Sequence, residues 1–211
     1  ELLDSHPGIC CEGELLCPQE RYVPTRAMRW LISLRPRPFF EFRRFRARQF
    51  VYGFRLMVFH APGCWSKLLD LQRKGWIVVY LHRQDLFQQA LSNVVALDRY
   101  RWLRKEGDPA DASAYSIDPD RVVSDIRWLR NLQRKEAQKV ADIAAVSISY
   151  EDDLLSAERW QATADGVCDA LGLPPAPVTC DVLKSFDRDY SQVVKNYEDV
   201  LCRVRESDCG D

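Results

Sequence analysis

The stretch Gly75-Trp76-Ile77-Val78-Val79-Tyr80-Leu81-His82-Arg83-Gln84-Asp85, which continues to Leu91-Ser92, decides the fold of this chain. Its first half, from Trp76 to Leu81, consists of strand-forming residues without polar alternation. Such a run predicts a strand that is buried on both faces and runs parallel to its neighbours. Asp85 is suited to cap a helix, and apolar residues then recur at helical spacing: Leu86, Ala90, Val94 and Leu97. We therefore expect a strand, a short turn and a helix.

Two polar residues flank that turn. Arg83 follows the carboxyl end of the strand, and Ser92 lies about two turns into the helix, roughly 10 Å along its axis. A guanidinium and a hydroxyl at the carboxyl edge of a parallel sheet are suited to hold one phosphate group. The alternative is structural: Arg83 forms a surface ion pair and Ser92 faces a neighbouring helix.

The rest of the chain alternates the same two kinds of element. We predict strands at 51–58, 76–81 and 145–149, and helices near 25–34, 64–74, 86–105, 119–141, 157–171 and 189–206. Asp118 and Ser156 stand where helix caps are expected, and Gly172 stands where a helix ends. This order predicts an α/β fold, a parallel sheet covered by helices on both faces, with a ligand at the carboxyl ends of the strands.

Length and composition limit the possibilities further. With 211 residues, 46% of them apolar, the chain is expected to form one domain around a sizeable core. Residues 107–116 are polar and rich in alanine, and we expect them to form a mobile loop. The formal net charge of −1 argues against bulk electrostatic attraction to nucleic acid or anionic membranes. No apolar run approaches the ~20 residues that a membrane-spanning helix needs.

The chain contains eight cysteines, and none of them is in a CxxC motif or at the spacing of a zinc site. Four lie in or beside apolar stretches, where we expect them to pack as small hydrophobic residues: Cys64, Cys168, Cys180 and Cys202. Cys10 and Cys11 are expected in a loop. Because disulfide frameworks are needed chiefly by smaller domains, we favour a reducing cytoplasm, with the Golgi lumen as the alternative.

Residues 35–48 combine arginine with phenylalanine, at Arg35, Arg37, Phe39, Phe40, Phe42, Arg43, Arg44, Phe45, Arg46 and Arg48. One interpretation is a flap over a substrate site, in which arginine binds an anionic or hydroxylated sugar and aromatic rings stack on it. The other, which we favour, is an amphipathic connector whose phenylalanines pack inward while the arginines stay solvated.

Several segments, in chain order, resemble sulfotransferases that use 3′-phosphoadenosine 5′-phosphosulfate (PAPS). The strand, Arg83, helix and Ser92 are similar to the motif with which that family holds the 3′-phosphate. Arg55 stands in a segment similar to the family's second core strand, where lysine is more usual. The similar segments are Leu2-Leu3-Asp4-Ser5-His6-Pro7-Gly8 with Gly13-Glu14, Tyr52-Gly53-Phe54-Arg55-Leu56-Met57, Ile148-Ser149-Tyr150-Glu151-Asp152, Leu171-Gly172-Leu173-Pro174-Pro175 and Asn196-Tyr197-Glu198-Asp199-Val200. Within the family, the chain most resembles the bacterial carbohydrate sulfotransferases of the trehalose and nodulation-factor group.

This resemblance implies a fold, a reaction and a set of ligands. The fold is the three-layer sheet of P-loop nucleoside triphosphate hydrolases. PAPS is the co-substrate, and a hydroxyl of a sugar, a glycolipid or another small molecule is the acceptor. Lys184 or Arg188 completes the 3′-phosphate site with Arg83 and Ser92, as a basic loop does in relatives; alternatively, Lys184 is a solvated residue before the last helix. No nucleic-acid partner is expected, because the rest of the chain offsets the positive charge of residues 35–48 and no RNA-binding motif accompanies them.

Sulfuryl transfer needs a base, because the acceptor alcohol must lose its proton as it attacks sulfur. Glu14 matches a family position whose carboxylate often points into the acceptor cleft, and Glu12 is the neighbouring alternative. His60 is the runner-up, although a lone histidine near an apolar strand is more often structural. His6 is expected to close a turn. No metal is required, since arginine and lysine can stabilise the charge that develops on the activated phosphosulfate.

The chain departs from the family in one respect. The phosphosulfate loop of the family should precede Leu2, and no comparable glycine-rich turn occurs elsewhere. We expect that the natural chain extends further at its amino end; the alternative is a non-catalytic interaction domain derived from a sulfotransferase. A P-loop kinase is a lesser alternative, because it needs a GK[ST] loop and a magnesium-binding aspartate that are not evident here.

Overall fold

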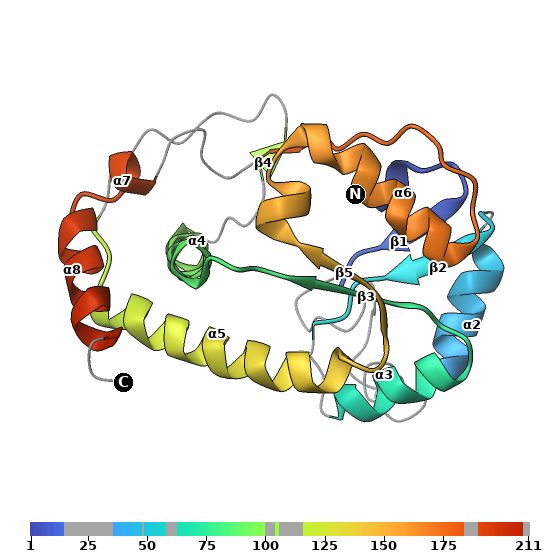
Figure 1. The fold of residues 1–211 in the computed structure, drawn as a ribbon, viewed down its shortest axis with the longest axis horizontal. Helices are drawn as coiled ribbons and strands as arrows, with labels where there is room; N and C mark the ends of the chain where they lie inside the picture. Colours follow the sequence, from blue (N-terminus) through green and yellow to red (C-terminus); the bar gives the residue numbers. More distant parts are fainter. Residues whose placement is uncertain are drawn as a thin grey trace. The chain divides into compact units, whose positions relative to one another are not determined.

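The computed structural model describes residues 1–14, 36–47, 49–57, 63–99, 104–105, 116–183 and 190–208. These residues form two compact units. Figure 1 colours the chain continuously from its N-terminus to its C-terminus. The first unit comprises Glu1–Leu81, Lys139–Ile148 and Asp152–Cys180, and the second comprises His82–Gln138, Ser149–Glu151 and Asp181–Asp211. Each unit is described below by itself, and the single domain expected from the sequence stays a prediction.

The first unit contains helices and short paired strands. A 3₁₀ turn, η1 (Leu3–Ser5), leads into β1 (Ile9–Glu12), which pairs in parallel with β2 (Val51–Phe54), from Ile9 opposite Val51 to Glu12 opposite Phe54. Three helices, α2 (Pro36–Arg46), α3 (Cys64–Arg73) and α6 (Ala157–Leu171), accompany them. β3 (Val78–His82) pairs with β5 (Ala144–Ser149), and each strand enters the second unit at its last residue.

The second unit is mainly helical. It contains α4 (Leu86–Arg99), most of α5 (Pro119–Val140), α7 (Tyr190–Val193) and α8 (Tyr197–Asp208). Two short strands, β4 (Arg104–Lys105) and β6 (Val182–Leu183), pair antiparallel. The irregular π-helical turn η2 (Tyr150–Leu154) follows β5 and begins in this unit. The described chain is therefore a mixed α/β structure, and its sheets have two strands each.

The core of the second unit is made by the apolar stripes of its helices. The buried residues that pack together are Ala90, Leu91, Val94, Val95, Ile117, Val122, Val123, Ile126, Leu129, Val193, Val194, Val200 and Val204. In α4 and α5 they recur three or four residues apart, so each helix turns one face toward the cluster. A hydrogen bond of 3.0 Å from Asn93 Nδ2 to Asp125 Oδ2 links the same two helices. This core fixes α4, and with it the position of Ser92.

The predicted helix boundaries are largely confirmed. α6 has the predicted bounds, and α3 and α5 end one residue early. The Asp85 carboxylate accepts a hydrogen bond of 2.9 Å from the Gln88 N–H, and that of Asp118 accepts one of 3.0 Å from the Asp120 N–H. Gly172 ends α6 with a left-handed φ of 68°, a conformation that glycine adopts without strain. Ser156 stands at the N-cap of α6, but its side chain accepts no capping hydrogen bond.

The prediction of a fully buried strand at 76–81 is wrong. No residue of β3 is buried, and Leu81 is 52% exposed. The physical reason is its place in the sheet. Among the described residues, β3 has a neighbouring strand, β5, along one edge only. Local sequence reports an apolar run, whereas burial depends on strands and helices from elsewhere in the chain.

Two predicted helices are shorter than expected. The helix predicted at 86–105 ends within the described residues at Arg99, since Arg104 and Lys105 pair as a strand with β6. The range near 189–206 holds two helices, α7 and α8, which residues 194–196 separate. Within the predicted strand at 51–58, β2 ends at Phe54. The helix predicted at 25–34 lies outside the described residues, as does the predicted loop 107–116 apart from Ser116.

Residues 36–46 form a helix with an unexpected orientation. Phe42 and Phe45 of α2 are 56% and 88% exposed, so the interpretation of a connector with inward-facing phenylalanines is wrong for these two residues. Ala47, just after the helix, packs instead against the small core made by Tyr52 and Leu71. Ala47 lies four residues after Arg43, which places both on the inner face of this segment.

We expect Asn196→Ala to destabilise the second unit. Asn196 donates from Nδ2 to the Ile117 carbonyl at 2.8 Å and accepts at Oδ1 from the Ile117 N–H at 3.0 Å, so one side chain satisfies both polar groups of a buried residue. Leaving them unpaired costs about 1–3 kcal/mol, measured as the free energy of unfolding in urea. Asn131→Ala on the exposed side of α5 is the control; equal effects of the two changes would contradict the assignment.

Candidate functional site

The carboxyl ends of β3 and β5 meet in the second unit, at the residues that the sequence singled out. Arg83 and Gln84 follow β3, and the Gln84 side chain donates from Nε2 to the Ser149 hydroxyl at the end of β5, 2.9 Å away. The Gln84 backbone N–H donates to Glu151 Oε2 at 2.8 Å. From α5, the Gln133 amide donates to the Arg83 carbonyl. The backbone that carries Arg83 is thus held from two sides.

The Arg83 side chain rests on residues of η2. Its guanidinium carbon lies 4.0 Å from the centroid of the Tyr150 ring, within the range of a cation–π contact. Its Nε lies 3.5 Å from Glu151 Oε1, which is an ion pair, yet this buried nitrogen has no hydrogen-bond partner. The contact is therefore electrostatic rather than a well-formed hydrogen bond. The terminal guanidinium nitrogens donate to no group among the described residues.

Ser92 and Arg83 both influence one phenol, that of Tyr190 in α7: Ser92 through a hydrogen bond and Arg83 through its positive charge. Burial raises the pKa of the Tyr190 phenol above its ordinary value, while a hydrogen bond with Ser92 and the positive charge of Arg83 oppose that rise. The nearby Tyr150 phenol raises it further. Five residues from four segments therefore form one cluster, which we call the Arg83 cluster. Arg83 follows β3, Ser92 lies in α4, Tyr150 and Glu151 follow β5, and Tyr190 lies in α7.

The ion pair of the structural alternative is present. Arg83 pairs with Glu151, whose side chain is 21% exposed. Glu151 is placed there because η2 folds back immediately after β5 and because its other oxygen accepts from Gln84. Two further proposed site residues, Lys184 and Arg188, lie outside the described residues, and so does the runner-up base His60.

Glu14 follows the parallel pair β1 and β2 in the first unit. Its Oε1 lies 3.0 Å from Nη2 of Arg55, and the Arg55 N–H donates to the carbonyls of Glu12 and Gly13. Because the strands are parallel, both residues stand at the same edge of this sheet. Glu14 and Arg83 belong to different units, so a shared cleft between them stays a prediction.

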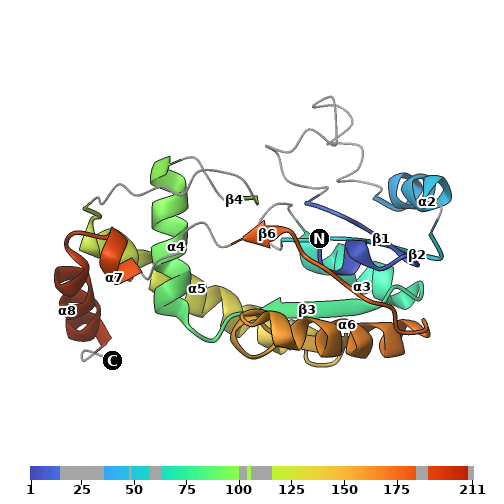
Figure 2. The same cartoon turned by 90° about the horizontal axis from the view of Figure 1, so that it is seen from above.

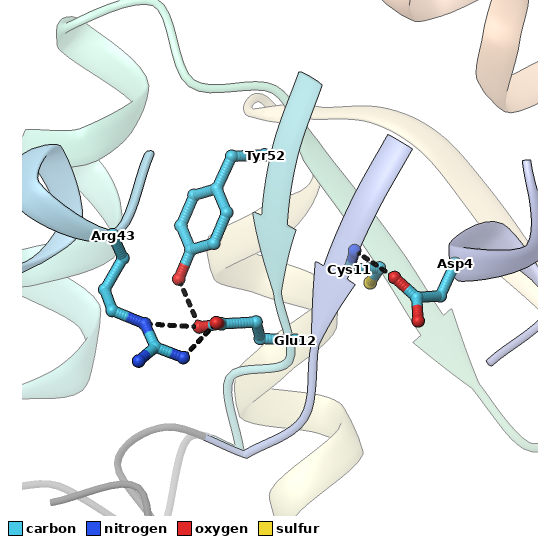
Figure 3. A network of polar contacts seen from close by, with 5 residues as sticks. All are labelled: Asp4, Cys11, Glu12, Arg43 and Tyr52. Carbon is cyan, nitrogen blue, oxygen red and sulfur yellow. Dashed lines mark hydrogen bonds and ion pairs between the residues drawn. The ribbon is translucent and has the colours of Figure 1, made fainter. Parts of the chain in front are cut away.

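Glu12, the alternative base, is held by two partners. Arg43 of α2 donates to both of its carboxylate oxygens, and the Tyr52 hydroxyl of β2 donates to Oε2 at 2.6 Å. Figure 3 shows these three side chains pointing toward one another on one side of β1, with Asp4 accepting from the Cys11 N–H on the other side. The hydrogen bond to Glu12 raises the pKa of the Arg43 guanidinium. Burial, then the bond to Glu12, raises the pKa of the Tyr52 phenol.

An open pocket of about 400 Å³ lies beside this network, lined by Cys10, Glu12, Arg43, Arg46, Ala47 and Gln49. It combines one carboxylate with two guanidiniums and an amide. Since the Glu12 oxygens already accept from Arg43 and Tyr52, this carboxylate is poorly placed to take a proton from a substrate. Glu12 is therefore a weaker candidate base than Glu14.

The predicted roles of histidine and cysteine are confirmed in part. His6 is buried and closes a turn as expected, since its Nδ1 accepts from the Gly8 N–H at 3.0 Å and its Nε2 lies 3.1 Å from the Pro174 carbonyl. Cys168 is buried in α6, whereas Cys202 is exposed on α8, so packing as a hydrophobic residue is wrong for the latter. Cys10 and Cys11 form part of β1 rather than a loop, because their backbone continues the ladder with Tyr52 and Gly53.

No protein-family model matches the chain, and no curated protein matches it. Within the described residues, no group of histidine, cysteine, aspartate and glutamate could hold a metal ion, and no helix has the length and apolar character of a membrane span.

Sequence reasoning missed three members of the Arg83 cluster. Tyr150 and Glu151 directly follow the strand predicted at 145–149, and Tyr190 lies in the helix predicted near 189–206. The available signal was the position of Tyr150 and Glu151 directly after a strand, the same position that directed attention to Arg83. No local signal identifies Tyr190, which lies 98 positions after Ser92 in the sequence.

Proposed function

We propose that this chain is part of a PAPS-dependent sulfotransferase that transfers the sulfuryl group to a hydroxyl of a carbohydrate or glycolipid. The observation that carries the proposal is the placement of Arg83 directly after β3, over the Tyr150 ring and beside Glu151, with Ser92 of the next helix hydrogen-bonded to the nearby Tyr190 phenol. A guanidinium and two hydroxyls from separate segments form a donor set suited to a phosphate group. We also propose that the strands belong to a three-layer parallel sheet, whose carboxyl edge carries the cluster.

Each residue of the Arg83 cluster has a part in this proposal. Arg83 supplies charge and terminal N–H donors to the 3′-phosphate, Ser92 supplies a hydroxyl donor, and Tyr150 supports the guanidinium from one face. Glu151 orients Arg83 through Nε and leaves its terminal nitrogens for the ligand. Lys184 or Arg188 adds a second positive charge.

The chemistry follows from the proposed base. The Glu14 carboxylate takes the proton of the acceptor hydroxyl as its oxygen attacks sulfur. The new bond joins that oxygen to sulfur, and the bond between sulfur and the 5′-phosphate oxygen breaks. The leaving group, 3′-phosphoadenosine 5′-phosphate, carries away the electron pair of that bond. Arg55 holds the Glu14 carboxylate in place.

The deciding experiment compares two nucleotides by calorimetric titration of the full natural chain. 3′-Phosphoadenosine 5′-phosphate should bind, and adenosine 5′-monophosphate, which lacks the 3′-phosphate, should bind at least about tenfold more weakly, as expected when one charge-assisted contact is lost. Transfer of labelled sulfate from PAPS to a sugar or glycolipid then tests the reaction. Equal affinities for the two nucleotides would refute the 3′-phosphate site.

A second candidate is a non-catalytic domain derived from a sulfotransferase. The pairing of Arg83 with Glu151 favours it, because a carboxylate already occupies part of the guanidinium. In that case the full chain binds neither nucleotide, and Arg83 serves only to join η2 to the turn after β3.

A further inference from the structure

The open pocket beside Glu12 is built by one face of β1 and one face of α2, both within the first unit. Cys10 and Glu12 line it together, because side chains two residues apart on a strand share a face. Arg43 and Arg46 lie three residues apart on α2, a spacing that also places them on one helix face. Figure 2 shows α2 beside β1 and β2. Gln49, from the segment between α2 and β2, completes this side of the lining.

The described lining of the pocket has one positive charge in excess. Glu12 and Arg43 neutralise each other, since the guanidinium donates to both carboxylate oxygens, as Figure 3 shows. Arg46 forms no ion pair with a described residue, and its guanidinium carbon lies 5.8 Å from the centroid of the Phe42 ring. Two guanidiniums and one carboxylate therefore leave a single positive charge for a ligand. A monoanion matches it, whereas the second charge of a dianion would be repelled by Glu12.

The remaining properties of the pocket favour a carboxylate on a small hydroxylated molecule. A guanidinium matches the planar geometry of a carboxylate and can bind both of its oxygens. The Gln49 amide has no hydrogen-bond partner among the described residues, and an amide can both donate to and accept from a hydroxyl group. The volume of about 400 Å³ falls within the range of about 300–1,000 Å³ that small-molecule sites occupy.

We propose that this pocket holds the carboxylate of a hexuronate, so that the acceptor of the reaction is an acidic sugar. The role as acceptor rests on the proposed function, whereas the affinity for hexuronate does not. β1 ends at Glu12, and the proposed base Glu14 follows two residues later, within about 7 Å of extended chain. A sugar ring spans such a gap. Its carboxylate binds Arg46, its hydroxyls contact Gln49, and one hydroxyl faces the Glu14 carboxylate.

The test is calorimetric titration of the full natural chain with glucuronate and with glucose, with and without saturating 3′-phosphoadenosine 5′-phosphate. The two sugars differ at one carbon, which carries a carboxylate in glucuronate and a hydroxymethyl group in glucose. Glucuronate should bind at least about tenfold more tightly than glucose, as expected for one charge-assisted contact. Inorganic sulfate at the same concentration should displace little of the bound glucuronate.

The two neighbouring cysteines of β1 locate the bound sugar. Glucuronate should slow the alkylation of Cys10, which lines the pocket, and leave that of Cys11 unchanged, because successive side chains of a strand point to opposite faces. Burial, then the charge of Glu12, raises the pKa of the Cys10 thiol, so the reaction with iodoacetamide is run at alkaline pH. Mass spectrometry of the labelled peptide distinguishes the two positions.

Arg46→Gln should remove the preference for glucuronate and leave the affinity for glucose unchanged. The matched control is Arg44→Gln, which removes the same charge from the same helix. The Arg44 side chain is 63% exposed, and 3.6 residues per turn place it about 160° around the helix axis from Arg46. This control should bind glucuronate like the unchanged protein.

Four results would each overturn the proposal: equal affinities for glucuronate and glucose, equal loss in the Arg44→Gln control, equal competition by sulfate, or binding without protection of Cys10. If the chain binds 3′-phosphoadenosine 5′-phosphate and does not prefer glucuronate, the pocket assignment is wrong and the sulfotransferase proposal stands. If it prefers glucuronate and binds no nucleotide, the pocket is supported as a hexuronate site, and the sulfotransferase and the acceptor role are refuted.

Discussion

Arg83→Ala is expected to weaken binding of 3′-phosphoadenosine 5′-phosphate by ~2–4 kcal/mol, which is roughly thirtyfold to several hundredfold in the dissociation constant. The guanidinium stands where two strand ends meet and contacts the Tyr150 ring, and its positive charge opposes the rise in the pKa of the Tyr190 phenol, to which Ser92 is hydrogen-bonded. Removing it takes away the only described charge that the cluster offers to a phosphate and leaves Glu151 as a repelling carboxylate. Calorimetric titration of the full chain measures the change.

Two controls separate this result from a loss of folding. Affinity for adenosine 5′-monophosphate should be nearly unchanged in the variant, because that nucleotide lacks the phosphate that Arg83 is proposed to hold. Arg134→Ala, which removes an exposed arginine from α5, should affect neither nucleotide. If Arg83→Ala lowers the affinity for both nucleotides equally, or lowers only the melting temperature, Arg83 is a structural ion-pair residue. The assignment of the 3′-phosphate site is then wrong.

Elements with strong local signals could be predicted from the sequence. The Asp85 cap and the apolar spacing after it predict α4, and Ser156 and Gly172 predict the two ends of α6. These signals work because a helix satisfies most of its hydrogen bonds within itself. Burial could not be predicted in the same way. Trp76 to Leu81 has the composition of a central strand, yet Leu81 is half exposed, since the neighbours of a strand come from distant segments.

The helix α2 shows a second limit of local reasoning. Its phenylalanines and arginines alternate in a pattern that indicates inward rings and solvated charges. The structure turns Arg43 inward because Glu12 and Tyr52, 31 positions before it and 9 positions after it, supply a carboxylate and a hydroxyl. Since a residue's polar partners can lie far away in the sequence, the pattern alone does not determine which face is buried.

The sequence likewise predicts only part of the candidate site. Arg83 and Ser92 lie nine residues apart on a strand end and the next helix, so their spacing predicts that they approach each other. Tyr150, Glu151 and Tyr190 arrive from other segments, and Glu151 changes the chemistry by pairing with Arg83. Asn196 holds Ile117 through two hydrogen bonds, which is a structural role.

Glu14→Gln is expected to lower the turnover of the full chain by about 100-fold or more, and to leave nucleotide affinity nearly unchanged. The amide keeps the size and much of the hydrogen bonding of the carboxylate, but it cannot accept the proton of an acceptor hydroxyl. The measurement pairs sulfate transfer under saturating substrates with calorimetric titration of 3′-phosphoadenosine 5′-phosphate. Loss of turnover with intact affinity places Glu14 on the acceptor side of the reaction.

Arg55 distinguishes a base from a loop organiser, because it is the described ion-pair partner of Glu14, with 3.0 Å between Nη2 and Oε1. If Glu14 acts only by holding Arg55, then Arg55→Gln should lower turnover as much as Glu14→Gln and lower nucleotide affinity with it. Glu12→Gln should instead reduce the free energy of unfolding, since it leaves Arg43 without its carboxylate partner. Near-normal turnover of Glu14→Gln would contradict the prediction and transfer the role of the base to His60 or Glu12. Substitutions at the three candidate bases, Glu14, Glu12 and His60, therefore assign the base: it is the residue whose replacement removes turnover and leaves nucleotide affinity intact.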